Sequence, residues 1–176
     1  MSDPFQTLGI DPRFDIDLKA VEARHRELSR ALHPDRYAQA PAAERRMALS
    51  RAIEVNEAWR AVRDPIKRAE ALFQRLGVPS GETAEPNPST ELLMEMMEAR
   101  EELSDAARAK NMEVVHNLAL KMRFRETEVT KALAAGLEQA GSSVEAARKL
   151  THHLGELRYL RRFLDEVSAI EESVLG

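Results

Sequence analysis

The sequence predicts an all-α fold in two parts: an N-terminal helical hairpin with flanking helices, followed by a C-terminal antiparallel three-helix bundle. Ala, Leu, Glu and Arg, which favour helices, recur along the whole chain, and β-branched residues rarely cluster. Apolar residues return at the spacing of helix faces. Gly, Pro and Ser crowd into residues 77–89, where a helix cannot continue. We therefore expect a first domain at 1–76, a linker at 77–89 and a second domain at 90–176.

The N-terminal part opens with a short helical turn and the first helix of the hairpin. The turn, at Pro4–Leu8, is expected to stop at Gly9. Asp17 is placed to cap a helix that runs to about residue 32. The apolar residues of this helix share one stripe: Leu18, Val21, Leu28 and Leu32. His25 lies on the same stripe, and we expect it to be a satisfied core residue.

The second helix of the hairpin is expected at about 42–63. Several of its residues face one way: Leu49, Ala52, Ile53, Asn56 and Trp59. Asp64 precedes Pro65 and is therefore biased out of the α region, which ends the helix. A further helix at 66–76 closes on Gly77.

The C-terminal part is expected to hold three long helices at about 90–109, 112–138 and 143–174. Ser142 followed by Glu145 is a capping box for the third of them. Apolar residues run down this third helix at near-heptad spacing: Leu150, Leu154, Leu157, Leu164 and Val174. Three such helices joined by short turns predict an antiparallel bundle.

A polar turn follows the first helix of the hairpin. Pro34 prevents the helix from continuing and presents His33 and Asp35 at a loop tip. A helix stop with polar flanks is the simpler interpretation. The approaching helix also carries a basic face opposite its apolar stripe, made of Lys19, Arg26 and Arg30, which lie within roughly 40° of one another. A solvated charged surface explains that face equally well.

Several of these features together resemble the J-domain family. They are the Leu8-Gly9 pair, the helix that ends in His33-Pro34-Asp35, and the run Asn56-Glu57-Ala58-Trp59-Arg60 before Asp64-Pro65. The resemblance covers roughly residues 4–75. It implies that a DnaK-type chaperone binds His33, Pro34, Asp35 and the basic face, and that this contact stimulates ATP hydrolysis. Asp35 would meet an arginine of the chaperone, and the basic face would meet an acidic surface.

The first helix of the C-terminal part has two apolar faces. One is an ordinary core stripe of Leu92, Met96, Ala99, Leu103 and Ala106. The opposite side carries Leu93, Met94, Met97, Glu98, Glu101 and Asp105. A bundle helix needs only one apolar stripe, so exposed Leu and Met beside acids indicate a docking surface. The alternatives are that this face packs on the first domain or broadens the core.

The run Leu93–Leu103, which contains most of this second face, and the later run Leu157-Arg158-Tyr159-Leu160 resemble the HscB family of iron–sulfur co-chaperones. With the J-like part, the resemblance covers nearly the whole chain. It implies an HscA-like ATPase and an IscU-like iron–sulfur scaffold protein as partners. The scaffold-binding residues that it implies are Leu93, Met94, Met97, Glu98, Glu101, Asp105 and Tyr159. Asp105 stands for a longer acid, Tyr159 for phenylalanine and Met97 for leucine.

Other functions are disfavoured. The chain has no cysteine, which excludes disulfides and thiolate ligands for zinc or an iron–sulfur cluster. His152 and His153 are neighbours that diverge around a helix, and no phosphate loop or serine elbow is recognisable, so we expect no enzyme activity, cofactor or metal. A net charge of −4 argues against nucleic-acid binding. Without a secretory signal or a long apolar run, we expect a cytoplasmic protein that does not enter membranes.

Two alternative functions remain at this point. A J-domain adaptor for another client would keep the ATPase effect and change the cargo. A structural bundle would instead use the surplus apolar face, around Met94 and Met97, for weak self-association.

Overall fold

The computed structural model describes residues 3–81, 84 and 86–175, and every regular element within these ranges is a helix. The chain divides into two compact units, Met1–Val78 and Pro79–Gly176. The division falls inside the Gly- and Pro-rich stretch expected to be a linker. Within the described ranges, no helix is both long enough and apolar enough to cross a membrane.

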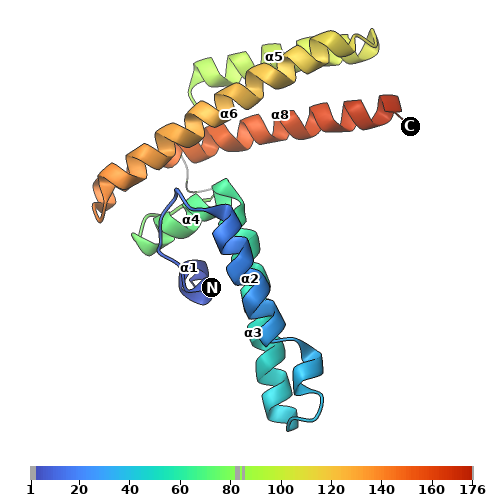
Figure 1. The fold of residues 1–176 in the computed structure, drawn as a ribbon. Helices are drawn as coiled ribbons and strands as arrows, with labels where there is room; N and C mark the ends of the chain where they lie inside the picture. The colour runs from blue at the N-terminus through green and yellow to red at the C-terminus, as the bar shows by residue number, and fades with distance from the viewer. Residues whose placement is uncertain (1–2, 82–83, 85, 176) are drawn as a thin grey trace. The chain divides into compact units, whose positions relative to one another are not determined.

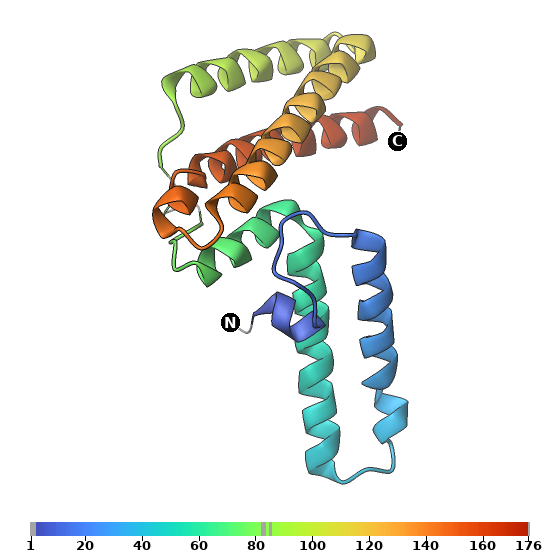
Figure 2. The same cartoon turned by 60° about the vertical axis from the view of Figure 1, so that its left-hand side comes forward.

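The first unit is a helical hairpin flanked by two shorter helices (Figures 1 and 2). Its elements are α1 (Pro4–Leu8), α2 (Leu18–Ala31), the 3-10 helix η1 (Pro34–Tyr37), α3 (Ala42–Arg63) and α4 (Pro65–Arg75). Helices α2 and α3 lie side by side and run in opposite directions, and α1 packs on α3. The predicted hairpin with flanking helices is therefore confirmed.

Aspartate side chains cap the N-termini of three helices of this unit. Asp3, Asp17 and Asp64 each accept hydrogen bonds from backbone N–H groups in the first turn of α1, α2 and α4, respectively. Gly9 ends α1 in the left-handed conformation, with φ of 66°. The caps at Asp17 and the stop at Gly9 were both predicted from the sequence.

The core of the first unit lies between α1, α3 and α4. Its largest fully buried side chains are Phe5, Leu8, Val62 and Phe73. Arg68 is also buried; its Nη1 donates to the carbonyl oxygen of Val62 at 2.8 Å, and its guanidinium lies over the ring of Phe14. Burial lowers the pKa of Arg68.

Helix α2 contributes less to this core than its pattern predicted. Of the stripe, only Val21 is buried, whereas Leu28 and Leu32 are half-buried and Leu18 is 43% exposed. The prediction of one buried stripe is wrong for Leu18, which sits in the first turn of α2. His25, which was expected in the core, is only half-buried.

The imidazole of His25 makes two contacts with α3. Its ring stacks on Trp59 with centroids 5.5 Å apart, and Nε2 lies 2.9 Å from Oδ1 of Asn56. These contacts turn Asn56 and Trp59 toward α2. Leu49 and Ile53, which were expected to face the same way, are 55% and 51% exposed. They lie nearer the distal end of the hairpin and do not share this contact.

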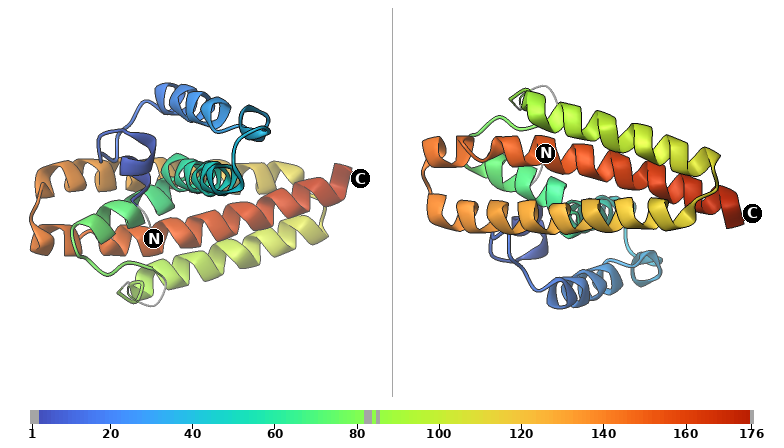
Figure 3. Two further views of the ribbon diagram at one scale, coloured as in Figure 1. Left: turned by 90° about the horizontal axis from the view of Figure 1, so that it is seen from below. Right: turned by 90° about the horizontal axis from the view of Figure 1, so that it is seen from above.

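The second unit is built around three long helices (Figure 3). Its elements are α5 (Thr90–Arg108), α6 (Met112–Ala140), the short α7 (Val144–Arg148) and α8 (Thr151–Leu175). Helix α6 runs antiparallel to both α5 and α8, and all three pack against one another. The predicted antiparallel three-helix bundle is confirmed.

The last predicted helix required correction in two respects. It is divided: α7 ends at Arg148, α8 starts at Thr151, and the hydroxyl of Thr151 donates back to the carbonyl of Arg148 at 2.8 Å. The N-cap is Ser143, whose side chain accepts from the N–H of Ala146, so the capping box at Ser142 and Glu145 was wrong.

The core stripe of α8 also differs from the prediction. The structure buries Leu154, Leu157, Leu160, Phe163 and Val167. Leu150 and Leu164 are only half-buried, and Val174 is 50% exposed. The buried residues recur mainly every third position, which rotates the stripe around α8 by about 60° per step. A fixed heptad pattern misses such a rotation.

Candidate functional site

The polar turn forms the tip of the hairpin, at the far end of α2 (light blue in Figure 2). Pro34 occupies the first position of η1, and Nδ1 of His33 accepts the backbone N–H of Asp35 at 3.3 Å. Oδ2 of Asp35 lies 3.4 Å from the same ring nitrogen. The Asp35 side chain is nevertheless 89% exposed. The turn therefore fixes the backbone of Asp35 and leaves its carboxylate open to a partner.

The basic face lies on the exposed side of α2. Lys19, Arg26 and Arg30 are all exposed, and they lie opposite the buried Val21. Arg26 forms an ion pair of 2.6 Å with Glu22 one turn earlier. An exposed pair of this kind is weak and exchanges readily for a stronger partner. The face is thus a positive surface that leads toward Asp35.

The second face of α5 forms an exposed ridge, which we call the acid-edged ridge. It consists of Leu93, Met94, Met97, Glu98, Glu101 and Asp105. Met97 is 71% exposed, Met94 58% and Leu93 38%. The predicted core stripe of α5 is buried in full. The interpretation in which the second stripe broadens the bundle core is therefore wrong.

The acids along the ridge differ in their surroundings. Glu98, Glu101 and Asp105 are all exposed. Asp105 forms an ion pair with Arg108 on the same helix. Its carboxylate is already engaged, whereas no ion pair of Glu98 or Glu101 occurs within the described part of the chain. Glu98 and Glu101 are the acids best placed to meet a basic partner.

Tyr159 is half-buried on the side of α8 that meets α5. It lies about 20° around the helix from Glu166, and Oε1 of Glu166 lies 2.9 Å from Nη2 of Arg100 on α5. Around the axis of α5, Leu93 lies about 20° from Arg100 and Met97 lies about 60° from it, both in the same direction. Tyr159 therefore lies on the flank of the bundle from which the ridge rises.

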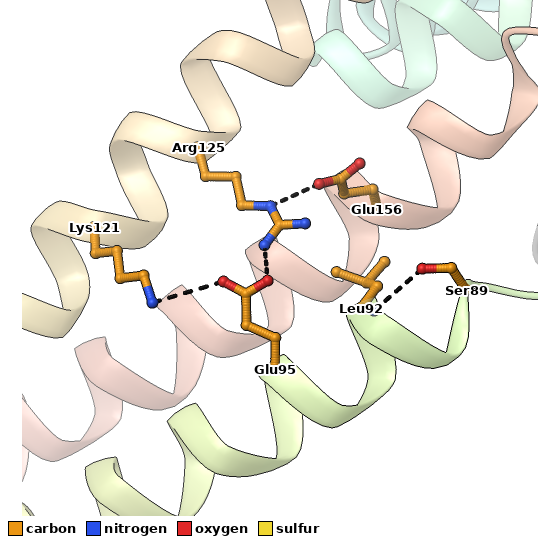
Figure 4. Close-up of polar contacts among 6 residues, drawn as sticks. All are labelled: Ser89, Leu92, Glu95, Lys121, Arg125 and Glu156. Carbon is orange, nitrogen blue, oxygen red and sulfur yellow. Dashed lines mark hydrogen bonds and ion pairs between the residues drawn. The ribbon is translucent and has the colours of Figure 1, made fainter.

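An ion-pair network joins the three long helices of the bundle (Figure 4). Arg125 of α6 pairs through Nη1 with Glu95 of α5, and its Nε donates to Oε1 of Glu156 on α8 at 2.7 Å. Lys121 Nζ lies 3.6 Å from the other carboxylate oxygen of Glu95. Ser89 caps α5 at the same end of the helix, where it accepts the N–H of Leu92 at 3.1 Å. The network fixes α5, and with it the direction of the ridge.

Ionisation of these side chains reflects their pairing. The hydrogen bond from Arg125 is the main reason that the pKa of Glu95 is lowered, and burial opposes it. Burial lowers the pKa of Arg125, but hydrogen bonds to Glu95 and Glu156 outweigh it, and the pKa is raised. Sequence reasoning missed these residues. The available signal was Glu95 itself, a charged side chain at the border between the core stripe and the solvent.

His152 and His153 are neighbours near the start of α8. The rings of His152 and His153 lie 4.0 Å apart, and burial lowers the pKa of His153. Across the residues that the structure describes, no group of three or more His, Cys, Asp or Glu side chains could hold a metal ion.

Comparison with known proteins gives one consistent match. Residues 88–168 match a family model described as the HSCB C-terminal oligomerisation domain. A co-chaperone protein HscB homolog of Shewanella sp. (strain MR-4) is 31% identical over 172 residues, which is 97% of this chain and 98% of that protein. Another homolog, from Azoarcus sp. (strain BH72), is 36% identical over 151 residues, or 84% of this chain and 85% of its own. The structure of the chaperone HscB from Vibrio cholerae superposes with a TM-score of 0.84 at 25% identity, covering 98% of this chain and 99% of that one.

Proposed function

Because the chain belongs to the HscB family of co-chaperones, we propose that it stimulates the ATPase of an HscA-like, DnaK-type chaperone and delivers an IscU-like iron–sulfur scaffold protein to it. The observation that carries this proposal is the separation of two exposed surfaces. The carboxylate of Asp35 is open at the hairpin tip, and the Met-rich ridge is open on α5 in the other unit. An adaptor needs two such surfaces, because it must hold both partners at once.

The hairpin tip supplies the contact with the chaperone. A carboxylate that is exposed on a stiff turn can accept two parallel hydrogen bonds from an arginine of the partner. Because the turn already holds the backbone in place, little further conformational entropy is lost on binding. Lys19, Arg26 and Arg30 attract an acidic surface and orient α2 before contact. Asp35 therefore triggers the ATPase, and the basic face accelerates encounter.

The acid-edged ridge supplies the contact with the scaffold. Met94 and Met97 have flexible side chains that adapt to an apolar pocket, and their exposure means that binding would remove them from water. Glu98 and Glu101 would pair with basic residues at the rim of the contact. Tyr159 would close the flank as a rigid aromatic anchor.

ATP turnover by the HscA-like chaperone tests the proposal. The wild-type chain is expected to raise the rate, and Asp35→Asn is expected to lose that stimulation because the neutral amide cannot replace the paired carboxylate. Asp11→Asn, at another exposed aspartate of the same unit, serves as the matched control and should stimulate like the wild type. Equal turnover with Asp35→Asn and wild type would remove the proposed role of the hairpin tip.

A further inference from the structure

The outer side of α6 carries a second apolar surface, separate from the ridge. Phe124 is 70% exposed and Leu120, one turn earlier, is 49% exposed. They lie within about 40° of each other and point away from the fully buried Met122, which marks the core side of α6. An exposed phenylalanine beside an exposed leucine is costly in water and has no role in the proposed contacts with chaperone or scaffold.

Charges border this pair symmetrically. Glu113 and Lys131 are both exposed, and Lys131 also forms an exposed ion pair of 2.9 Å with Glu128 of the same helix. Glu113 and Lys131 are separated by eighteen residues, or about five turns, so they lie on the same line along α6. That line passes between Leu120 and Phe124. Each charge is nine residues, or about 13–14 Å, from Met122, with the acid on one side and the base on the other.

This arrangement is complementary to itself. When a second α6 is laid antiparallel against the first about a two-fold axis at Met122, Leu120 of each copy meets Phe124 of the other. Glu113 of each copy then meets Lys131 of the other. A two-fold interface requires this kind of self-complementarity, in which one surface contains both members of every pair. Four apolar side chains would be buried between two ion pairs.

We infer that two copies of this chain associate through the outer face of α6, antiparallel, with Leu120 and Phe124 at the centre and Glu113 and Lys131 at the ends. The family model that spans this helix is described as an oligomerisation domain, which agrees with a second copy as the occupant. The inference is independent of the proposed co-chaperone function. It also places self-association on α6, away from Met94 and Met97.

The edges of the contact make the dimer weak. Lys121 lies at one edge, but its charge is matched by Glu95 of the same chain at 3.6 Å. Arg123 is exposed at the other edge and faces its own copy across the two-fold axis. Only two apolar side chains per copy are buried, which places the interface below the roughly 1,200 Å² of a standard stable complex. Association is therefore concentration-dependent, and Arg123→Ser should strengthen it.

Sedimentation velocity of the full chain over a concentration series tests the inference. The sedimentation coefficient should rise with concentration for the wild type and for Met97→Lys, and should stay at the monomer value for Phe124→Glu. Glu113→Lys should also weaken association, and Lys131→Glu in the same chain should restore it. A wild type that stays monomeric would overturn the inference. So would a Phe124→Glu variant that still associates, or a Met97→Lys variant that does not.

The absence of cysteine allows a direct test of orientation. Under mild oxidation, a mixture of Glu113→Cys and Lys131→Cys chains should form a disulfide-linked dimer, because the two positions face each other. Glu113→Cys alone should not, since the two copies of residue 113 are about 27 Å apart along the helix axes. Equal cross-linking of the mixture and of Glu113→Cys alone would contradict the antiparallel contact.

Discussion

Arg125 on α6 donates from Nε to Oε1 of Glu156 on α8 at 2.7 Å, and the same guanidinium holds Glu95 on α5. One cation therefore joins all three long helices of the bundle. Because Glu95 lies beside Met94 and Met96, the network fixes which residues of α5 face the core and which form the ridge. The network therefore links the stability of the bundle to the orientation of the ridge, which is the proposed scaffold-binding surface.

Arg125→Leu is expected to lower the free energy of unfolding by about 2 kcal/mol, because it leaves two partly buried carboxylates without their common donor. Urea unfolding followed by far-UV circular dichroism measures the change. Arg108→Leu is the matched control, since Arg108 belongs to an exposed pair on α5, and its effect should stay within about 0.5 kcal/mol. Equal losses in the two variants would contradict the structural role of the network.

The network also predicts a pH dependence of stability. The pKa of Glu95 is lower in the folded chain than in the unfolded chain. Its stabilising contribution is therefore complete above the ordinary glutamate pKa, about 4.3, and is lost as the pH falls through the lowered folded value. The difference in unfolding free energy between wild type and Glu95→Gln should thus shrink on acidification from pH 7. Glu102→Gln, an exposed acid two turns later on α5, should differ little from the wild type at either pH.

Charging the ridge should abolish scaffold binding. Met97→Lys places an ammonium at the centre of the apolar contact, and titration calorimetry with the IscU-like scaffold should show at least a tenfold loss of affinity. Val144→Lys changes an exposed apolar residue of α7 in the same way and should bind like the wild type. Undiminished binding by Met97→Lys would show that the scaffold docks elsewhere.

The acids of the ridge should contribute unequally. Asp105 is already paired with Arg108, so Asp105→Ala is expected to change scaffold affinity less than Glu101→Ala. The same calorimetric titration ranks the two variants. A larger loss for Asp105→Ala would mean that the ion pair with Arg108 opens on binding.

Removing the basic face should slow encounter with the chaperone. The triple variant of Lys19, Arg26 and Arg30 to alanine is expected to reduce the association rate at low salt, and the difference from wild type should fade as salt rises. At saturating concentrations of the variant, stimulation of the ATPase should persist, because Asp35 is intact. Stopped-flow association rates at several salt concentrations test this, with Arg51→Ala on α3 as the control. Equal rates for the triple variant and the wild type would contradict electrostatic steering.

The sequence predicted α5 almost completely, and the reason is physical. Helix α5 packs on its neighbours along one side only, so the core stripe and the ridge separate cleanly at 100° per residue. In α2 the same periodicity wrongly predicted that Leu18 is buried. Leu18 lies in the first turn of the helix, where the hairpin leaves it exposed. In α8 it identified Leu154 and Leu157 correctly but missed Leu160, Phe163 and Val167, because the buried stripe rotates along the helix.

Contacts between distant residues could not be predicted in this way. Arg125 meets Glu95 and Glu156 across about thirty positions of sequence in each direction, and only the packing of three helices brings them together. The break between α7 and α8 depends on Thr151 closing onto Arg148, which competes with an otherwise helical pattern. The exposure of Phe124, by contrast, could be predicted from periodicity alone, because Phe124 lies on the side of α6 that faces away from Leu118 and Met122.

The proposed function requires separate surfaces for the ATPase and for its cargo on one chain. The most direct test measures ATP turnover by the HscA-like chaperone with and without the IscU-like scaffold, in the presence of wild type, Asp35→Asn or Met97→Lys. Met97→Lys should keep the scaffold-independent stimulation and lose the further increase that the scaffold provides, whereas Asp35→Asn should lose both. If Met97→Lys abolished the scaffold-independent stimulation, or if Asp35→Asn retained it, the two surfaces would not have the separate roles assigned to them.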